Sequence, residues 1–233
     1  MARVPRSLTV RESQAVHKVW RGHNREPNLG GDHHKNAYLD FLNADLESQK
    51  YKQGQEITAM TLMSNHTHEM YQIISPELFS NHMRRHHSRY GAYFNKLENR
   101  CGKVAQDRPH TTLIEDSQHE METVFYIHAN PVRAGIVGDA RDYLWSTHRW
   151  YAFGKKALWM RNFKLPDWYQ KLGRTLEQRQ RAYRRLFARY LELKGRFKQN
   201  FLKKRFFGSP VWCDRKERAV TDWRRGQNLD PPD

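Results

Sequence analysis

The sequence has little cysteine and no long apolar run, and both absences narrow the class of protein. Cys101 and Cys213 are the only cysteines in 233 residues, too few for a disulfide framework and without the spacing of a zinc site. No stretch approaches the roughly 20 apolar residues that cross a bilayer. The first residues also lack the apolar core of a signal peptide. We therefore expect a cytoplasmic protein, associated with the nucleoid if it binds DNA.

Acidic residues are scarce relative to basic ones. The chain has 41 Lys and Arg against 25 Asp and Glu, a formal charge of +16. Such an excess favours a polyanionic partner, nucleic acid first and an anionic membrane surface second. Residues 161–225 hold 20 Lys and Arg against 6 Asp and Glu, whereas residues 1–160 hold 21 against 17. The charge that binds the polyanion is therefore concentrated in the last third of the chain.

Aromatic residues are abundant, which predicts a folded chain. Seven Trp, eleven Tyr and eleven Phe accompany an apolar fraction of 38%, whereas disordered chains are poor in aromatics. Periodicity and turn residues predict the order β-α-β-β-α-β-α. The expected strands are 14–22, 56–63, 66–74 and 109–114, and the expected helices are 32–50, 76–100 and 117–130, the last ending near Pro131.

This order predicts an α+β fold, an antiparallel sheet with helices on one face. A second part begins near Asp139 and contains a basic helix over 175–194, in which arginines alternate with apolar positions. We therefore divide the chain into a domain at 1–138 and a basic helical C-terminal extension at 139–233 that contacts DNA.

His66 and His68 are two positions apart, with Thr67 between them, in the strand predicted at 66–74. Side chains two apart in a strand share a face, so the two imidazoles can bind one divalent metal ion. Two histidines on a solvated strand face would give the same pattern. The adjacent pairs His33-His34 and His86-His87 are interpreted as solvated.

Tyr126 and Asn130 are four apart in a predicted helix and therefore share a face. A tyrosine hydroxyl is a weak nucleophile at its ordinary pKa of about 10, so it needs an activated electrophile. A metal ion that polarises a phosphodiester provides one, and Asn130 could give that ion a neutral oxygen ligand. The alternative is a core tyrosine near a helix end, with Asn130 as the cap before Pro131.

Four segments resemble the single-tyrosine HUH transposases, and within them the transposases associated with repetitive extragenic palindromes (REP). They are Val-Trp-Arg-Gly-His-Asn-Arg at 19–25, Leu-Met-Ser-Asn-His-Thr-His at 62–68, Tyr-Ile-His-Ala-Asn-Pro-Val-Arg-Ala-Gly-Ile-Val at 126–137 and Tyr-Leu-Trp-Ser-Thr-His-Arg at 143–149. The likeness covers about residues 14–155 in order. It implies an HUH endonuclease fold, a ferredoxin-like palm.

The resemblance also implies site residues and a reaction. The metal ligands of that family fall on His66, His68 and Asn130, and its nucleophile falls on Tyr126. The implied enzyme nicks and rejoins single-stranded DNA hairpins through a 5′-phosphotyrosine link, with Mg²⁺ or Mn²⁺ and without ATP. The implied partners are single-stranded REP hairpins and no membrane, and a monomer is favoured over a dimer.

Several arginines are candidate DNA contacts, because binding charge is cumulative along a phosphate backbone. They lie near the first strand, on the long helix at 76–100 and in the basic helix: Arg21, Arg25, Arg84, Arg85, Arg89, Arg181, Arg184, Arg185 and Arg189. Two other functions stay open. One is a hairpin-binding protein without catalysis on the same fold, and the other is a relative of replication initiators and relaxases.

Overall fold

A five-stranded sheet is the centre of the computed structural model, which describes residues 4–51, 53–194 and 204–226. The strand order is β2-β3-β1-β4-β5. Strands β1 to β4 pair antiparallel, and β5 pairs parallel to β4. The strands are β1 (Ala15–Arg21), β2 (Gln55–Leu62), β3 (His66–Ile73), β4 (His110–Ile114) and β5 (Phe206–Phe207).

Helices make up most of the remaining structure. The α-helices are α1 (Asp32–Glu47), α2 (Pro76–Leu97), α3 (Ser117–Arg133), α4 (His148–Phe153), α5 (Asp167–Gln170), α6 (Leu176–Lys194) and α7 (Pro210–Arg224). The described residues also form four short 3-10 helices: η1 (Arg6–Leu8), η2 (His23–Arg25), η3 (Ala140–Asp142) and η4 (Leu158–Met160). The predicted α+β class is confirmed, and each element expected before residue 134 is present.

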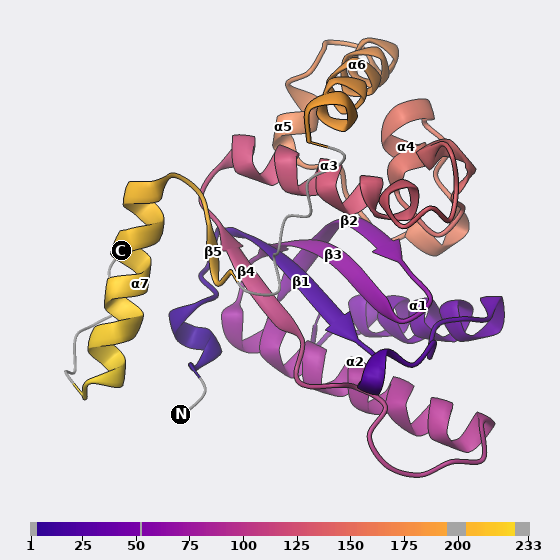
Figure 1. Cartoon of the computed structure of the whole chain (residues 1–233), viewed down its shortest axis with the longest axis vertical. Helices are drawn as coiled ribbons and strands as arrows, with labels where there is room; N and C mark the ends of the chain where they lie inside the picture. The colour runs from indigo at the N-terminus through magenta and orange to yellow at the C-terminus, as the bar shows by residue number, and fades with distance from the viewer. Residues whose placement is uncertain (1–3, 52, 195–203, 227–233) are drawn as a thin grey trace.

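The helices cover both faces of the sheet, not one face as we expected. Val16 and Trp20 of β1 pack against α1 and α2, whereas Ala15 of the same strand packs against α3. This alternation is the ordinary consequence of strand geometry. Figure 1 shows α1 and α2 beneath the sheet and α3 above it, with α4, α5 and α6 beyond α3. The expected sheet also differs in one strand, because β5 is parallel.

A buried ionic network ties the sheet to α1. Lys18 of β1 and Glu69 of β3 are fully buried, with 2.6 Å between Nζ and Oε1. Glu69 also accepts hydrogen bonds from the hydroxyls of Tyr38, Tyr71 and Thr67. Burial by itself would raise the pKa of Glu69, but Lys18, Thr67 and Tyr71 bring it below the ordinary value. The carboxylate is therefore ionised and fully partnered.

Helix α3 begins where the sequence predicts but ends later. Asp116 caps it by accepting hydrogen bonds from the backbone N–H groups of residues 118 and 119. We expected the helix to end near Asn130, but it continues through Pro131 to Arg133. A proline removes one backbone donor, and the backbone N–H of Ala134 still bonds the carbonyl of Asn130. Arg133 therefore stays on the helix about two turns after Tyr126.

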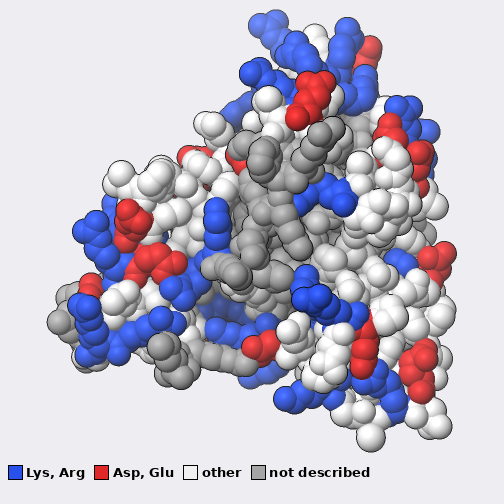
Figure 2. Space-filling model, in the orientation of Figure 1, with Lys and Arg blue, Asp and Glu red and all other residues white. Residues whose placement is uncertain are grey.

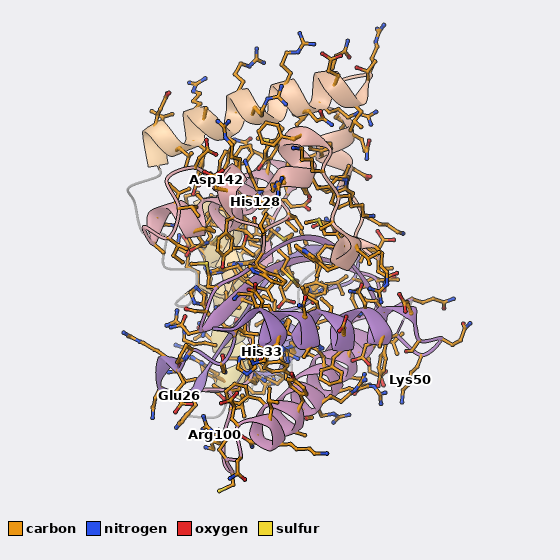
Figure 3. All side chains as sticks on the ribbon, turned by 90° about the vertical axis from the view of Figure 1, so that its right-hand side faces the viewer. Glu26, His33, Lys50, Arg100, His128 and Asp142 are labelled. Atoms are coloured by element: carbon orange, nitrogen blue, oxygen red, sulfur yellow. The ribbon has the colours of Figure 1, made fainter. Side chains whose placement is uncertain are left out.

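Residues after 139 pack against α3. His128 of α3 is fully buried between two hydroxyls, with Nδ1 2.7 Å from Tyr183 Oη and Nε2 2.7 Å from Thr147 Oγ1. Figure 3 places His128 among the helices above the sheet and His33 on α1 beneath it. The basic helix predicted at 175–194 is present as α6. Residues on both sides of the 138/139 boundary thus share one core.

The last described segment, which we did not predict in detail, extends the sheet. Strand β5 pairs with β4, and Ser209 caps α7, which lies along that edge of the sheet in Figure 1. Within the described ranges, no helix has the length and apolar character needed to span a membrane.

Replacing Glu69 tests whether the buried network holds the fold. The change Glu69→Gln leaves the Lys18 ammonium buried without a counter-ion, so we expect a loss of about 3–5 kcal/mol in the free energy of unfolding. The double change Lys18→Met with Glu69→Leu should cost much less. Urea denaturation monitored by circular dichroism measures both. A Glu69→Gln variant as stable as the natural chain would contradict this account.

Glu120 should make stability depend on pH. Burial raises the pKa of Glu120 to about 7, although Gln72 donates a hydrogen bond to its carboxyl group. Between about pH 4.5 and 7 the folded chain holds more protons than the unfolded chain, so the free energy of unfolding falls as pH rises through that window. Glu120→Gln should remove a decrease of roughly 3 kcal/mol in the free energy of unfolding across this window, measured by thermal denaturation across pH. An unchanged slope would exclude Glu120 as its source.

Candidate functional site

His66 and His68 lie on the face of β3 that α3 covers. Their side chains share that face with Met70, which packs against α3, whereas Tyr71 packs on the opposite face. The two imidazole rings lie 4.9 Å apart at an interplanar angle of 84°. The predicted pairing of the two side chains on one face is therefore present.

Each ring has its Nδ1 atom in a hydrogen bond. His66 Nδ1 lies 2.6 Å from Asn65 Oδ1, an acceptor, so Nδ1 carries the proton and Nε2 keeps its lone pair. Asn65 is itself oriented, because its Nδ2 donates to the carbonyl oxygen of Arg25. His68 Nδ1 lies 3.0 Å from His17 Nε2. Nε2 is thus the remaining nitrogen of both rings, which is the arrangement that outer partners impose on metal-binding histidines.

His17 is a site residue that the sequence analysis missed. It is fully buried in β1, and its ring stacks on His68 with 5.2 Å between centroids and 17° between planes. The sequence places His17 in a strand, but it does not say that this strand pairs with β3. The β1–β3 register, which sets Val19 opposite His68 and His17 opposite Met70, is what joins the two rings.

Burial keeps both candidate ligands neutral. It lowers the pKa of His66 to about 4, and the charge of Arg21 adds to this effect. Burial also lowers the pKa of His68 well below its ordinary value, with smaller contributions from His66 and His17. Neutral imidazole is the form that binds a metal ion, so the pair is ready to bind at neutral pH.

Tyr126 projects from α3 toward these histidines. Its ring lies 5.4 Å from the His68 ring at 90°, and 6.1 Å from the His17 ring. The side chain is 7% exposed. Burial raises the pKa of Tyr126, and Arg133 and Arg21 act in the opposite direction.

Arg133 is the second residue that the sequence analysis missed as a participant. Its guanidinium carbon lies 4.8 Å from the centre of the Tyr126 ring. Arg133 Nη1 and Arg21 Nε are both buried without a hydrogen-bond partner among the described residues. A buried donor without a partner is costly, so two such donors beside one phenol indicate a place for an anion. The signal in the sequence was the spacing of seven from Tyr126, which becomes a shared face only if the helix passes Pro131.

Asn130 lies one turn after Tyr126 and is half-buried. Its Nδ2 donates to the carbonyl oxygen of Tyr126 over 2.8 Å, so Oδ1 is the atom that could bind a metal. Its role as a ligand stays a prediction.

The donor set fits a divalent ion. It comprises two imidazole nitrogens and one amide oxygen, all neutral, which leaves coordination positions for water or phosphate oxygens. Imidazole nitrogens suit first-row transition ions better than Mg²⁺, so Mn²⁺ fits better than Mg²⁺. Two other clusters of potential ligands occur among the described residues, His33 with His34 and Glu98, and Glu115 with Asp116 and His119.

The predicted DNA-binding arginines divide into three places. Arg21 ends β1 beside the histidines, and Arg25 is the exposed last residue of η2, whose carbonyl oxygen orients Asn65. The arginines of α2 lie in the layer on the other side of the sheet, where Arg85 and Arg89 pair with the buried Asp45 and Arg84 is exposed. The arginines of α6 lie beyond α3: Arg181, Arg184, Arg185 and Arg189.

The arginines of α6 differ in how far they are engaged. Arg181 pairs with Glu177 at the surface, and Arg184 donates to the carbonyl of Ala152. Arg185 and Arg189 are exposed. Figure 2 shows Lys and Arg side chains gathered at the top of the molecule, where α6 lies.

We expected both adjacent histidine pairs to be solvated, and this prediction is wrong. His33 is exposed, but His34 is buried and binds Glu98 over 2.9 Å. His86 is fully buried against the ring of Tyr38. His34 and His86 are buried because they lie on the inner sides of α1 and α2. Two adjacent histidines in a sequence do not reveal which side of a helix each will occupy.

Comparison with known proteins gives one structural similarity. A solved structure described as a REP-associated tyrosine transposase bound to a REP hairpin has 21% sequence identity and a TM-score of 0.48. The match covers 63% of this chain and 84% of that one. That protein is of the kind that residues 62–68 and 126–137 resemble. Neither the known protein-family models nor the curated proteins match this chain.

Replacing His17 tests its influence on the candidate metal site. In His17→Ala the His68 ring loses its hydrogen-bond partner, so we expect affinity for Mn²⁺ to fall about 10- to 100-fold. Isothermal titration with Mn²⁺ measures this, and the signal belongs to this site if His66→Ala abolishes it. Tyr93→Phe, a change in α2 on the other side of the sheet that removes no potential ligand, serves as the control. Equal affinities of His17→Ala and the natural chain would remove His17 from the site.

Proposed function

We propose that this protein is a metal-dependent endonuclease and strand transferase for single-stranded DNA hairpins, with Tyr126 as its nucleophile. The observation that carries the proposal is the meeting of Tyr126 and His68 with two guanidinium nitrogens, of Arg21 and Arg133, that lack a partner among the described residues. A phosphodiester is the anion that suits this set, because arginine recognises phosphate with several donors.

Two partly buried guanidinium groups would hold the phosphate. Arg21 Nε and Arg133 Nη1 would each donate to a phosphate oxygen, and this would satisfy two donors that otherwise have no partner among the described residues. Arg25 contributes charge on the same side, since it lowers the pKa of Arg21, after the larger effect of burial. The shared positive potential attracts the DNA backbone.

The chain's residues have defined roles in the reaction. His66 and His68, through Nε2, and Asn130, through Oδ1, would hold Mg²⁺ or Mn²⁺, which polarises the phosphodiester when bound. Tyr126 Oη then attacks phosphorus and loses its proton. The bond from phosphorus to the 3′ oxygen breaks, and that oxygen leaves as a hydroxyl. Arg133 and Arg21 favour the phenolate, because their charges oppose the effect of burial on the pKa of Tyr126.

The covalent link conserves the energy of the broken bond. A DNA 3′-hydroxyl can attack the 5′-phosphotyrosine, release Tyr126 and join a new junction without ATP. Joining and cutting are the same chemical step run in opposite directions, so one site serves for both.

The hairpin itself would be held mainly by shape and phosphate contacts. The exposed Arg185 and Arg189 of α6, together with Arg25 near the histidines, are the surface cations best placed for this. We propose REP-type hairpins as the substrate and a monomer as the working form. Contacts by Arg84, Arg85 and Arg89 would require the hairpin to reach the layer of α2.

A second function is favoured by one observation. Tyr126 is only 7% exposed, which suits a protein that binds hairpins without cutting them. In that case the histidines and arginines would hold a phosphate, and no covalent product would form.

A covalent adduct separates these functions. A 3′-labelled hairpin oligonucleotide incubated with Mn²⁺ or Mg²⁺ should leave its label on the protein, visible after denaturing electrophoresis. Tyr126→Phe should abolish the adduct, because it removes the attacking oxygen, and hairpin affinity should change less than about twofold. Tyr93→Phe, a change of the same kind in α2, should keep the adduct.

Two results would overturn the assignment. An adduct that persists in Tyr126→Phe would mean that another residue attacks. Binding without any adduct in the natural chain, with either metal ion, would favour the hairpin-binding function.

A further inference from the structure

A pocket of about 390 Å³ lies at the β2 edge of the sheet. The segment from Leu144 to Met160, which follows η3 and includes α4 and η4, forms it. Asp142, the last residue of η3, is labelled in Figure 3. The backbone N–H of Leu62 bonds the carbonyl of Trp145 over 2.9 Å, so the pocket is fixed to the last residue of β2. Its volume is in the range of ligand pockets, roughly 300–1,000 Å³.

The lining of the pocket combines flat aromatic surface with positive charge. Its described residues include Trp145 and Trp159 and three cations, Arg149, Lys155 and Lys156, and no carboxylate. Such a composition favours an anionic ligand that also has a flat apolar part.

Neighbouring residues hold both indoles in place. Trp145 Nε1 donates to Asp32 over 3.1 Å, and the Lys35 ammonium lies 5.4 Å from the centre of the Trp145 ring. The Trp159 ring packs edge-on against Phe163, with 5.6 Å between ring centroids. The backbone carbonyl of Trp159 accepts a hydrogen bond from Asn43 Nδ2. Both rings are therefore oriented before any ligand binds, which lowers the cost of binding.

The three cations are not equally available. The Lys156 ammonium donates to the carbonyl of Phe163 over 3.2 Å and lies 4.5 Å from the centre of the Trp150 ring. Arg149 and Lys155 make no side-chain hydrogen bond or ion pair with other described residues. Two cations are thus available for an anion at the rim of the pocket.

We propose that this pocket binds an unpaired base of single-stranded DNA, with the base against the indoles and the adjoining phosphate on Arg149 and Lys155. Stacking on aromatic side chains and cations along the backbone are how proteins grip single strands. The choice of DNA as the ligand rests on the proposed function. The aromatic and basic lining of the pocket is observed independently of that function.

The position of the pocket suits a strand that leaves the candidate site. His66 begins β3 and Leu62 ends β2, and the backbone N–H of Met63 bonds the carbonyl of His66, so both lie at one end of the same hairpin. Two strand spacings, or roughly 10 Å, separate the backbones of Trp145 and β3. Trp145 and Trp159 pack against the core beneath the sheet, so the DNA would pass around the β2 edge.

Base dependence of binding tests the proposal. In Tyr126→Phe, which prevents cleavage, a fluorescent hairpin with thymidine flanks should bind about tenfold more tightly than the same hairpin with abasic flanks. Adding Trp159→Ala should reduce the thymidine affinity to the abasic level. Adding Arg218→Gln, which removes an exposed charge of α7 at the opposite edge of the sheet, should keep the tenfold difference. Fluorescence anisotropy measures each affinity.

If the variant with Trp159→Ala folds and still binds thymidine flanks about tenfold more tightly than abasic flanks, the proposal is overturned. If that variant does not fold, photo-crosslinking of the natural chain with a 5-iodouracil flank decides. The expected crosslinks map to Trp145 or Trp159, and crosslinks confined to residues outside 144–160 would refute it. Adduct formation on Tyr126 is measured separately, so the base pocket and the proposed catalysis can fail independently.

Discussion

The alternation of side chains along β3 is the constraint on which the other features depend. Glu69 points to the layer of α1 and α2, where it binds Lys18 and two tyrosines. The flanking His68 points to the layer of α3, where it meets Tyr126. A register shift of one residue would exchange these environments and place a carboxylate against the tyrosine. The buried ionic network therefore also fixes the orientation of the candidate ligands.

Helix α3 carries the other residues of the candidate site, Tyr126, Asn130 and Arg133. Its position is fixed by contacts with the segments that pack on its far side from the sheet. His128 bonds Tyr183 of α6 and Thr147 before α4, and Thr147 in turn bonds the backbone of Met60 in β2. One fully buried imidazole thus joins α3 to the C-terminal helices, and Thr147 joins those helices to the sheet. The same contacts set the segment that forms the Trp145 and Trp159 pocket, so site and pocket share one support.

Burial has opposite consequences for the groups of the site. It keeps His66 and His68 neutral, which suits metal binding, but it disfavours the phenolate of Tyr126. Arg21 and Arg133 counter the second effect. One buried nitrogen of each lacks a partner among the described residues, and this leaves a cost that a bound phosphate would remove. Conflicts of this kind between local stability and arrangement are expected where a protein binds or reacts.

The sequence by itself determined the order of elements before residue 134, the shared face of His66 and His68, and the shared helix of Tyr126 and Asn130. These follow from periods of two and 3.6 residues, which are local. Only the tertiary structure decided that β1 lies beside β3, which adds His17, and that α3 lies over that pair. It also decided that α3 passes Pro131, which adds Arg133, and that helices cover both faces. Contacts between segments far apart in the chain make these choices, and no local pattern encodes them.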